Sequence, residues 1–441
     1  MTTYRRIISV LWGAAALAAP AHGQDAAERV PLARSYVDES TGLGLDAAIA
    51  RAHEREPSLR AVRAEVAAAR GRREQAGLRP NPSVTAEHRA EPAGTDALTS
   101  VELSLPLDLF RRRGRVHTAD RELQATQWQV TDRERLLAAD VRMQYGVAAG
   151  WAREVAVADD VVGTAQRQLA VVRARVEAGR TPPLEGDLLE VDVRRLETLR
   201  LLAAGRADAA LVQLKRLLGM TPDEPLLLRE TLETLVASRT AAAPHDSSVA
   251  AASRPDVREA EVRVLLADAR IDEARREGRI DVSLFGAYMR MDAGFPQQGF
   301  GPTGAMERVR GQFHYVAAGA MIMLPVLNRN QGQLAATQAE HIGARARHQA
   351  VQLAARAEVA AAEVREMRAQ QAIDLYTGGL RALARQNLDV VRQTFDLGRG
   401  TVFDVLTEQR RYLEIEQAYT AALRDAWDAR VELQRARGET R

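Results

Sequence analysis

The histidines and methionines of this sequence carry side chains that could bind a borderline or soft metal ion. His341 and His348 are seven residues apart, which places them roughly on one face of a helix. No His-Glu-x-x-His or other metal-ligand spacing is present, so we expect a solvated or interface role for both. Four methionines near the predicted strands carry thioethers that suit soft metals, but we expect them to pack in a core or against lipid. These methionines are Met289, Met291, Met321 and Met323.

The sequence contains no recognisable catalytic constellation. It has no cysteine, which excludes a disulfide, a thiolate nucleophile, a cysteine-ligated zinc ion and an acylated N-terminal cysteine. It also lacks a phosphate-binding loop, a nucleophile elbow and a defined pair of carboxylates. The sequence therefore predicts neither an enzyme nor a resident cofactor or metal.

Composition excludes two further classes of protein. The 61 Lys and Arg residues are balanced by 59 Asp and Glu, and the formal net charge of +2 gives no case for a nucleic-acid partner. The mean hydropathy of -0.27 is too polar for a helical membrane protein. Beyond the first residues, no apolar run reaches the length of about 18 residues that a membrane helix requires. If the mature chain crosses a bilayer, it does so as strands.

The first residues have the features of a cleaved secretory signal peptide. Arg5 and Arg6 precede an apolar run over 7–19, and Ala-His-Gly at 21–23 places small residues where a signal peptidase acts. The surroundings of the arginine pair fit a twin-arginine signal poorly, so an ordinary signal is preferred. We expect residues 1–23 to be removed and the mature chain to begin near Gln24.

The mature chain is an internal duplication. Pro106 and Pro325 are 219 positions apart, and so are Gly179 and Gly398, each of which interrupts a predicted helix. Each half reads helix, strand, strand, helix, helix. After the glycines the spacing becomes 217, and it aligns Asp187 with Asp404, Leu189 with Leu406, Leu196 with Leu413 and Glu197 with Glu414. The predicted units are a first repeat over 43–219 with strands at about 82–89 and 98–107, a linker or equatorial region over 220–253, and a second repeat over 254–438 with strands at about 279–291 and 311–324.

The helices are too long for a globular domain. Apolar residues recur every seven positions between Arg115 and Val176, with one four-residue stutter, which indicates a coiled coil. The stretch from Asn330 to Leu397 is similar. The two shorter helices, over about 49–78 and 184–218, together have nearly the length of the long one. Stacked end to end, they could flank the long helix, so a coiled-coil cylinder is expected. A solvated two-helix stalk is the alternative.

The four predicted strands suit an outer membrane. Thr99, Val101 and Leu103 alternate with polar residues, and six aromatic residues fall between 285 and 315 in a chain with few aromatics, as at membrane interfaces. Four strands cannot close a membrane barrel, so several chains must share one. The alternative is a small soluble β-subdomain with these rings in its core.

Taken together, the layout resembles the TolC family of outer-membrane efflux channels over nearly the whole mature chain. The resemblance rests on the duplicated unit, Pro-Leu-Asp-Leu-Phe at 106–110, Leu-Pro-Val-Leu-Asn-Arg-Asn-Gln-Gly at 324–332 and the paired glycine breaks. The second run is most similar to the heavy-metal branch of CzcC-like and CusC-like channels. The resemblance implies a mainly α fold with a small β part. It also implies a homotrimer in the outer membrane of a Gram-negative bacterium, with a β-barrel in the lipid and a helical tunnel in the periplasm.

The same resemblance assigns three groups of site residues. The helix-hairpin tips that contact a periplasmic adaptor are Gly179, Arg180, Thr181, Gly398, Arg399, Gly400 and Thr401. The periplasmic aperture corresponds to Asp187, Asp404 and Thr407, where three copies of Asp404 would favour cations and raise one another's pKa. Two positions depart from the family's pattern. Thr407 stands where the family has a second acidic residue at the aperture. The first hairpin tip is two residues longer than the second. Pro106 and Pro325 mark the turns from barrel to helix.

The predicted function is a passive exit duct of a tripartite efflux system, with an adaptor and an inner-membrane pump of the RND type. The metal-branch run favours heavy-metal cations as cargo. Multidrug efflux and type I secretion remain alternatives, and a periplasmic adaptor or a coiled-coil scaffold is a more distant one. The adaptor alternative would need a β-rich lipoyl-like domain, and the scaffold would leave the aromatic strands unexplained.

Overall fold

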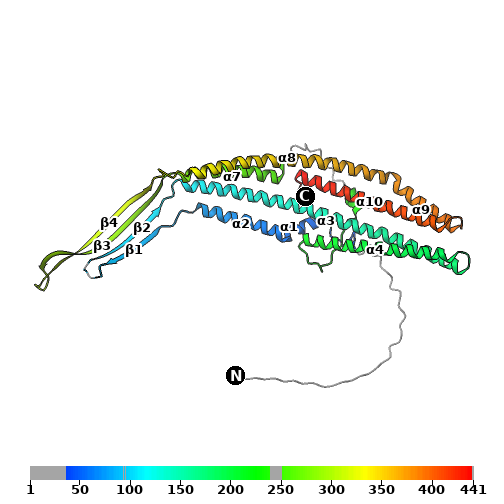
Figure 1. The fold of residues 1–441 in the computed structure, drawn as a ribbon, viewed down its shortest axis with the longest axis horizontal. Helices are drawn as coiled ribbons and strands as arrows, with labels where there is room; N and C mark the ends of the chain where they lie inside the picture. The colour runs from blue at the N-terminus through cyan, green and yellow to red at the C-terminus, as the bar shows by residue number, and fades with distance from the viewer. Residues whose placement is uncertain (1–35, 93, 95, 239–250, 440–441) are drawn as a thin grey trace, which may run out of the picture.

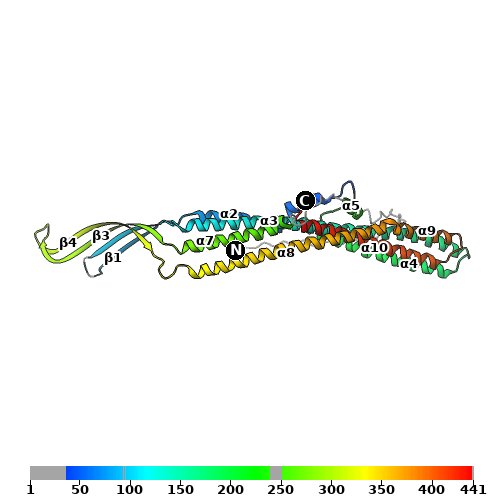
Figure 2. The ribbon, with the colours of Figure 1, turned by 90° about the horizontal axis from the view of Figure 1, so that it is seen from above.

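The chain folds into an elongated rod with a sheet at one end. The computed structural model describes residues 36–92, 94, 96–238 and 251–439. Long helices run side by side along the rod, and four strands leave it at an angle (Figure 1; Figure 2). The predicted signal peptide over 1–23 lies outside the described residues.

The two halves follow the same order of elements. The first half contains α1 (Leu45–Arg55), α2 (Pro57–Gly77), β1 (Ser83–Ala90), β2 (Ala97–Pro106), α3 (Arg111–Glu177) and α4 (Pro183–Leu217). The second contains α7 (Pro255–Glu277), β3 (Asp281–Phe300), β4 (Met306–Met323), α8 (Gln331–Leu375), η2 (Tyr376–Leu380), α9 (Arg381–Asp396) and α10 (Val402–Arg437). The predicted duplicated unit of helix, strand, strand, helix and helix is therefore confirmed.

The strands form one antiparallel sheet in the order β1-β2-β3-β4. β3 and β4 differ from the predicted strands over 279–291 and 311–324, because β3 continues to Phe300 and β4 begins at Met306. The hydrophobic alternation stops before these ends, but the two strands continue to pair with each other. The register is irregular between Gly294 and Gln298, which accommodates Pro296 without a ladder hydrogen bond from its nitrogen.

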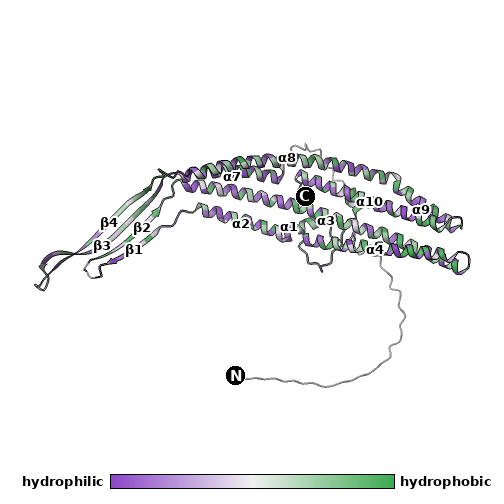
Figure 3. Ribbon diagram, viewed as in Figure 1, coloured by the Kyte–Doolittle hydropathy of each residue, from purple (hydrophilic) through white to green (hydrophobic). Residues whose placement is uncertain are grey.

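The helix α3 is the continuous long helix that the heptads predict. It spans 67 residues, and it buries the heptad positions from Val141 to Leu169. It contacts α2 and α7 toward the sheet, and α4 and α10 toward the hairpins. None of the helices in the described ranges has an 18-residue stretch apolar enough to cross a membrane, and polar and apolar residues mix along each of them (Figure 3).

The second long helix is interrupted, contrary to the prediction over 330–397. α8 ends at Leu375, a π-helical turn η2 follows, and α9 continues the rod. The cause is the pair Gly378 and Gly379, since Gly379 adopts φ +135°, a backbone conformation that a side chain disfavours. The heptad pattern runs through this pair and therefore conceals the break.

The region between the repeats does more than link them. Tyr36 packs with residues 226–236 against the middle of the rod, and α5 (Leu232–Ala237) contacts α3 and α10. Leu228 pairs with Val37 and Leu43 as isolated β-bridges. The described part of the predicted 220–253 segment is thus a packed belt, while its stretch over 239–250 lies outside the described residues.

Two glycines let α3 and α10 approach closely at the middle of the rod. A Cβ atom on Gly146 would lie 2.1 Å from Cδ1 of Trp427, and one on Gly150 would lie 2.4 Å from Cδ of Arg424. The buried indole donates a hydrogen bond from Nε1 to the carbonyl oxygen of Arg142 at 2.9 Å. The crossing therefore depends on the missing side chains.

The hydrophobic core is divided along the rod. One cluster fills the middle, where Tyr145, Leu214 and Leu228 are fully buried. A second lies toward the hairpins and includes Leu388 and Val405. A third, smaller cluster joins α7, α8 and α10. Because many members of these clusters are alanines, the helices pack closely over a great length.

Candidate functional site

The two helical hairpins end in the same backbone motif. The N–H of Gly179 donates to the carbonyl of Val176 at 2.9 Å, and the N–H of Arg180 donates to Arg175 at 2.8 Å. Gly398 and Arg399 repeat both bonds at 2.9 and 3.0 Å, to Phe395 and Thr394 respectively. Both glycines have positive φ, 69° and 73°, so each hairpin has a Schellman C-cap with an exposed tip.

The tips differ after the glycine. The first continues through Thr181 into Pro182 and Pro183, which cap and begin α4. The second has a capping box: the N–H of Asp404 donates to the Thr401 hydroxyl oxygen at 3.3 Å, and the N–H of Thr401 donates to Oδ2 of Asp404 at 3.0 Å. The tips therefore present different chemistry on the same backbone frame.

Replacing Thr401 with alanine is expected to loosen the first turn of α10. The change removes the hydroxyl that holds Asp404, and loss of an N-cap costs about 0.5–2 kcal/mol of local stability. Hydrogen–deuterium exchange of a peptide over 398–408 should be faster in the variant. Thr407→Ala, one turn further on the exposed side of the same helix, is the matched control and should exchange as the parent does. Equal exchange in the two variants would contradict the capping role.

The predicted aperture residues lie close to the hairpin tips, and all three are exposed. Asp187 is in the second turn of α4, and Asp404 and Thr407 are in the first two turns of α10. The side-chain and backbone hydrogen bonds from Thr401 lower the pKa of Asp404 within one chain. This direction is opposite to the effect that three converging copies would have.

The two hairpins are joined to each other near the tips. Arg175 donates to the carbonyl oxygen of Asp396 at 3.0 Å and lies over the Phe395 ring. Gln409 donates from Nε2 to Oδ2 of Asp192 at 2.9 Å. Asp192 and Gln409 are equivalent positions of the two repeats, 217 residues apart, so α4 and α10 meet across a pseudo-twofold relation.

The two connections between sheet and helix are built differently. Pro325 is the centre of a tight turn, because the N–H of Val326 donates to the carbonyl of Leu324 at 2.9 Å. At the other connection Pro106 is still part of β2, and the chain turns two residues later at Asp108, which has φ 47°. The buried Asp108 carboxylate accepts a hydrogen bond from Arg115 at 2.5 Å. The first turn is therefore at Asp108 and not at Pro106.

The sheet has two chemically different faces. We call one the apolar face; its large exposed side chains are Val84, Val101, Leu103, Leu105, Leu284, Tyr288, Val316 and Ile322. We call the other the mixed face; on β1 and β2 it carries Thr85, Glu87, Ser100 and Glu102, and on β3 and β4 it carries the four methionines with Phe313 and Tyr315. Along β3 from 283 to 290, mixed-face residues are half-buried and apolar-face residues exposed, which indicates that the sheet curves around its mixed face.

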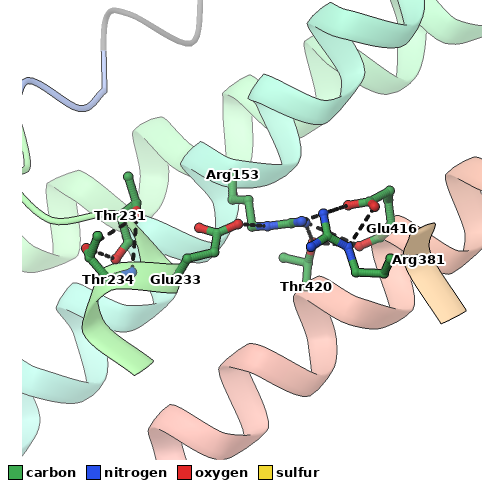
Figure 4. A network of polar contacts seen from close by, with 7 residues as sticks. All are labelled: Arg153, Thr231, Glu233, Thr234, Arg381, Glu416 and Thr420. Atoms are coloured by element: carbon green, nitrogen blue, oxygen red, sulfur yellow. Dashed lines mark hydrogen bonds and ion pairs between the residues drawn. The ribbon is translucent and has the colours of Figure 1, made fainter. Parts of the chain in front are cut away.

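A network of charges centred on the buried Arg153 and Glu416 holds α3, α5, α9 and α10 together at the middle of the rod (Figure 4). The Arg153 guanidinium on α3 donates to Oε2 of Glu416 on α10 at 2.7 Å, and also to Thr420. It further bonds Glu233 in the first turn of α5. Arg381, the first residue of α9, donates to both Glu416 oxygens at 2.8 and 3.0 Å. Two positive and two negative side chains are therefore balanced.

Glu416 is the centre of this network. Only 3% of the residue is exposed. Burial alone would raise the pKa of Glu416, but hydrogen bonds from Arg381 and Arg153 outweigh burial and lower it. Both guanidinium groups also lie over the ring of Tyr419, at 4.9 Å for Arg153 and 4.1 Å for Arg381. The arrangement fixes the start of α9 immediately after the interruption η2.

The sequence pattern did not predict this network. Arg153 and Glu416 are 263 residues apart, and Arg381 lies beyond the glycine pair that the heptads conceal. Charged residues are ordinarily expected on the solvated faces of a coiled coil, so nothing in their spacing indicated burial.

The histidine pair shows no sign of metal binding. His341 lies 3.1 Å from the Asp268 carboxylate, and His348 is 3.1 Å from the side-chain nitrogen of Gln352. Among the described residues, no group of three His, Asp or Glu side chains could hold a metal ion. Both histidines contact their own helix or its neighbour instead.

A sheet with one apolar face, such as the one that continues from these helical hairpins, is the kind of surface that a transmembrane β-barrel presents to lipid. The chain belongs to the outer membrane efflux protein family, whose model matches residues 48–220 and 247–439. Membership makes it a channel protein of the Gram-negative outer membrane and not an enzyme, as the sequence predicts.

Solved structures confirm the predicted fold. A structure of CusC matches with a TM-score of 0.73 and 18% identity, over 95% of this chain and 99% of that one. The open-state MtrE outer membrane channel of Neisseria gonorrhoeae matches with 0.72 and 21% identity, over 89% and 88%. The outer membrane protein VceC of Vibrio cholerae matches with 0.68 and 18% identity, over 89% and 96%. No curated protein sequence matches the chain.

Proposed function

We propose that this chain is one protomer of a homotrimeric exit duct in a tripartite efflux system that exports heavy-metal cations. In this proposal a signal peptide over 1–23 directs the chain across the inner membrane. The sheets of three copies close one barrel in outer-membrane lipid, and the helices form a periplasmic tunnel. The energy for export comes from the inner-membrane pump of the RND type.

The observation that carries this proposal is the sheet. Among the described residues, its outermost strands, β1 and β4, each leave one edge without a strand partner, and unpaired edges are costly in lipid. Other copies of the chain would supply those partners. Val316 on the apolar face is 85% exposed, which favours contact with lipid on that side. The mixed face, with Glu87 and Glu102, would then line the lumen.

The hairpin tips are the proposed contacts for the adaptor. Gly179 with Arg180 and Thr181, and Gly398 with Arg399, expose backbone and guanidinium groups that a partner can bind. We further propose that Asp404, with Asp187 and Thr407, borders the aperture, and that the aperture opens when the adaptor moves the hairpins. The bonds from Arg175 to Asp396 and from Gln409 to Asp192 would have to yield in that movement.

The cargo is tested by the growth of a deletion strain beside its complemented parent. We expect selective sensitivity to divalent or soft cations such as cobalt, zinc, cadmium, copper or silver, because the run over 324–332 is most similar to the metal branch. Selective sensitivity to amphipathic drugs would move the chain to multidrug efflux. Loss of a secreted protein from the medium, without either sensitivity, would identify a type I secretion channel.

Localisation is tested by fractionation of the same strain. The protein should be recovered in the outer-membrane pellet as a trimer and should begin near Gln24. Recovery only in the soluble periplasmic fraction would contradict the duct and favour an adaptor or a scaffold.

A further inference from the structure

Two methionine pairs of the sheet project from the same face. Met289 and Met291 are separated by one residue in β3, and Met321 and Met323 by one residue in β4. Residues two apart in a strand share a face. Met321 lies opposite Ser283, which shares its face with Met289 and Met291. Both pairs therefore lie on the mixed face.

This placement gathers methionine sulfur atoms on the mixed face. The chain has nine methionines and no cysteine, so four of its thioethers are gathered on one face of two neighbouring strands. Packing against lipid would place them on the apolar face with Val101 and Val316. The register places them instead on the face that carries Ser100 and Glu102.

We propose that each pair binds a soft monovalent cation, of the Ag⁺ or Cu⁺ type, on the wall of the exit duct. The inference rests on the proposed function, since the mixed face becomes a lumen only when the barrel closes. Two residues of one strand face start about 7 Å apart along the chain, and the flexible methionine side chain lets both sulfurs reach one ion. Thioethers favour Cu⁺ over hard cations.

The surroundings of the pair in β3 suit a cation. Tyr315 lies opposite Met289, and Phe313 lies opposite Met291 on β4, and aromatic faces attract cations. Glu102 on β2 pairs with Ala287, one same-face step from Met289. The Glu102 carboxylate therefore adds negative charge near the sulfur atoms, although Glu102 does not lie directly opposite either methionine.

The pair in β4 lies at the end of the sheet nearest the helices. Met321 and Met323 are both exposed, 65% and 64%. The carboxylate of Asp281, directly opposite Met323, lies 3.2 Å from the Arg111 guanidinium and is already paired. The free ligands are therefore the thioethers. A cation leaving the tunnel would meet this pair first and the pair in β3 second, and several weak sites in sequence allow passage.

The test is the current through single channels of the purified protein in a planar lipid bilayer, with potassium nitrate as electrolyte. Silver nitrate is added on the side of the helices. Ag⁺ should interrupt the potassium current of the parent. The fourfold leucine variant, Met289→Leu with Met291→Leu, Met321→Leu and Met323→Leu, should need about tenfold more Ag⁺ for the same effect, because its soft ligands are gone. Leucine has nearly the volume of methionine, so the conductance in potassium nitrate alone should be unchanged.

Two controls isolate the position of the sulfur. Met143→Leu with Met367→Leu removes two thioethers from the helices and should leave Ag⁺ sensitivity as in the parent. Ile322→Met, added to the fourfold leucine variant, places one thioether on the apolar face and should not restore sensitivity.

The outcomes separate this inference from the proposed function. If the parent conducts potassium and the fourfold leucine variant is interrupted at the same Ag⁺ concentration, the methionine sites are wrong and the duct stands. If the parent forms no conducting pore, the duct itself is wrong. Ag⁺ titration calorimetry of the same two proteins in detergent gives a second readout, in which the variant should lose most of the heat of binding.

Discussion

Replacing Glu416 with alanine is expected to lower the free energy of unfolding by about 1.5–3 kcal/mol, because Arg381 loses its carboxylate partner and Arg153 keeps only Glu233 and Thr420. Arg153 loses its bond of 2.7 Å and remains buried, while Arg381 loses both of its bonds. The measurement is thermal unfolding of the purified protein, followed by its helical circular dichroism.

Two further variants make this prediction specific. Glu416→Gln keeps the shape and can still accept hydrogen bonds, so its loss of stability should be smaller than that of the alanine variant. Glu408→Ala removes an ion pair on the same helix, in which the Glu408 carboxylate lies 2.8 Å from the Arg411 guanidinium. The Arg411 side chain is exposed. Such pairs are worth about 0–1 kcal/mol, so this variant should unfold close to the parent. Equal effects of Glu408→Ala and Glu416→Ala would show that the buried network has no special weight.

Replacing Gly146 with alanine is expected to cost about 2–3 kcal/mol, at the upper end of what overpacking of a close contact costs. The added methyl group would lie 2.1 Å from Cδ1 of Trp427, which is far inside van der Waals contact. The indole cannot move freely, since its Nε1 is bonded to the carbonyl of Arg142. The measurement is again thermal unfolding, together with tryptophan fluorescence, which should shift if the indole is displaced.

The matched control for this change is Gly205→Ala in α4. A Cβ atom at Gly205 would have no heavy atom within 4 Å, and alanine is favoured over glycine inside a helix by up to about 1 kcal/mol. The same substitution should therefore stabilise the protein slightly at Gly205 and destabilise it at Gly146. A stabilising effect at both positions would mean that α3 and α10 do not cross as closely as described.

Periodicity predicted the architecture of this protein well. The repeats follow from the 219-residue spacing of Pro106 with Pro325 and of Gly179 with Gly398, because equal spacing over such a distance requires a common plan. The continuous α3 follows from its heptads, and the sheet from the alternation around Val101. These features depend on periodic patterns within one segment. Such patterns can be read from a single sequence, because they do not depend on which segments contact each other.

Other features depend on pairing between segments, and sequence reasoning could not find them. The network around Glu416 joins residues hundreds of positions apart, and the close approach at Gly146 requires Trp427 from the other repeat. The extra length of β3 and β4 is sustained by their mutual ladder and not by hydrophobic alternation. The face occupied by the four methionines likewise follows only from the strand register. The predicted roles of the tips and of Asp404 remain proposals that the experiments above test.

The division of the core into three clusters has a consequence for how the protein loses its structure. A globular domain with one core usually unfolds in a single cooperative step. In a rod whose packing is mainly between neighbouring stretches, the stability of one stretch is nearly independent of a distant one, as in repeat proteins. Damage near the hairpins would then melt that end while the middle, around Tyr145, stays folded. The molecule is in this sense closer to a chain of linked segments than to a single cooperative body.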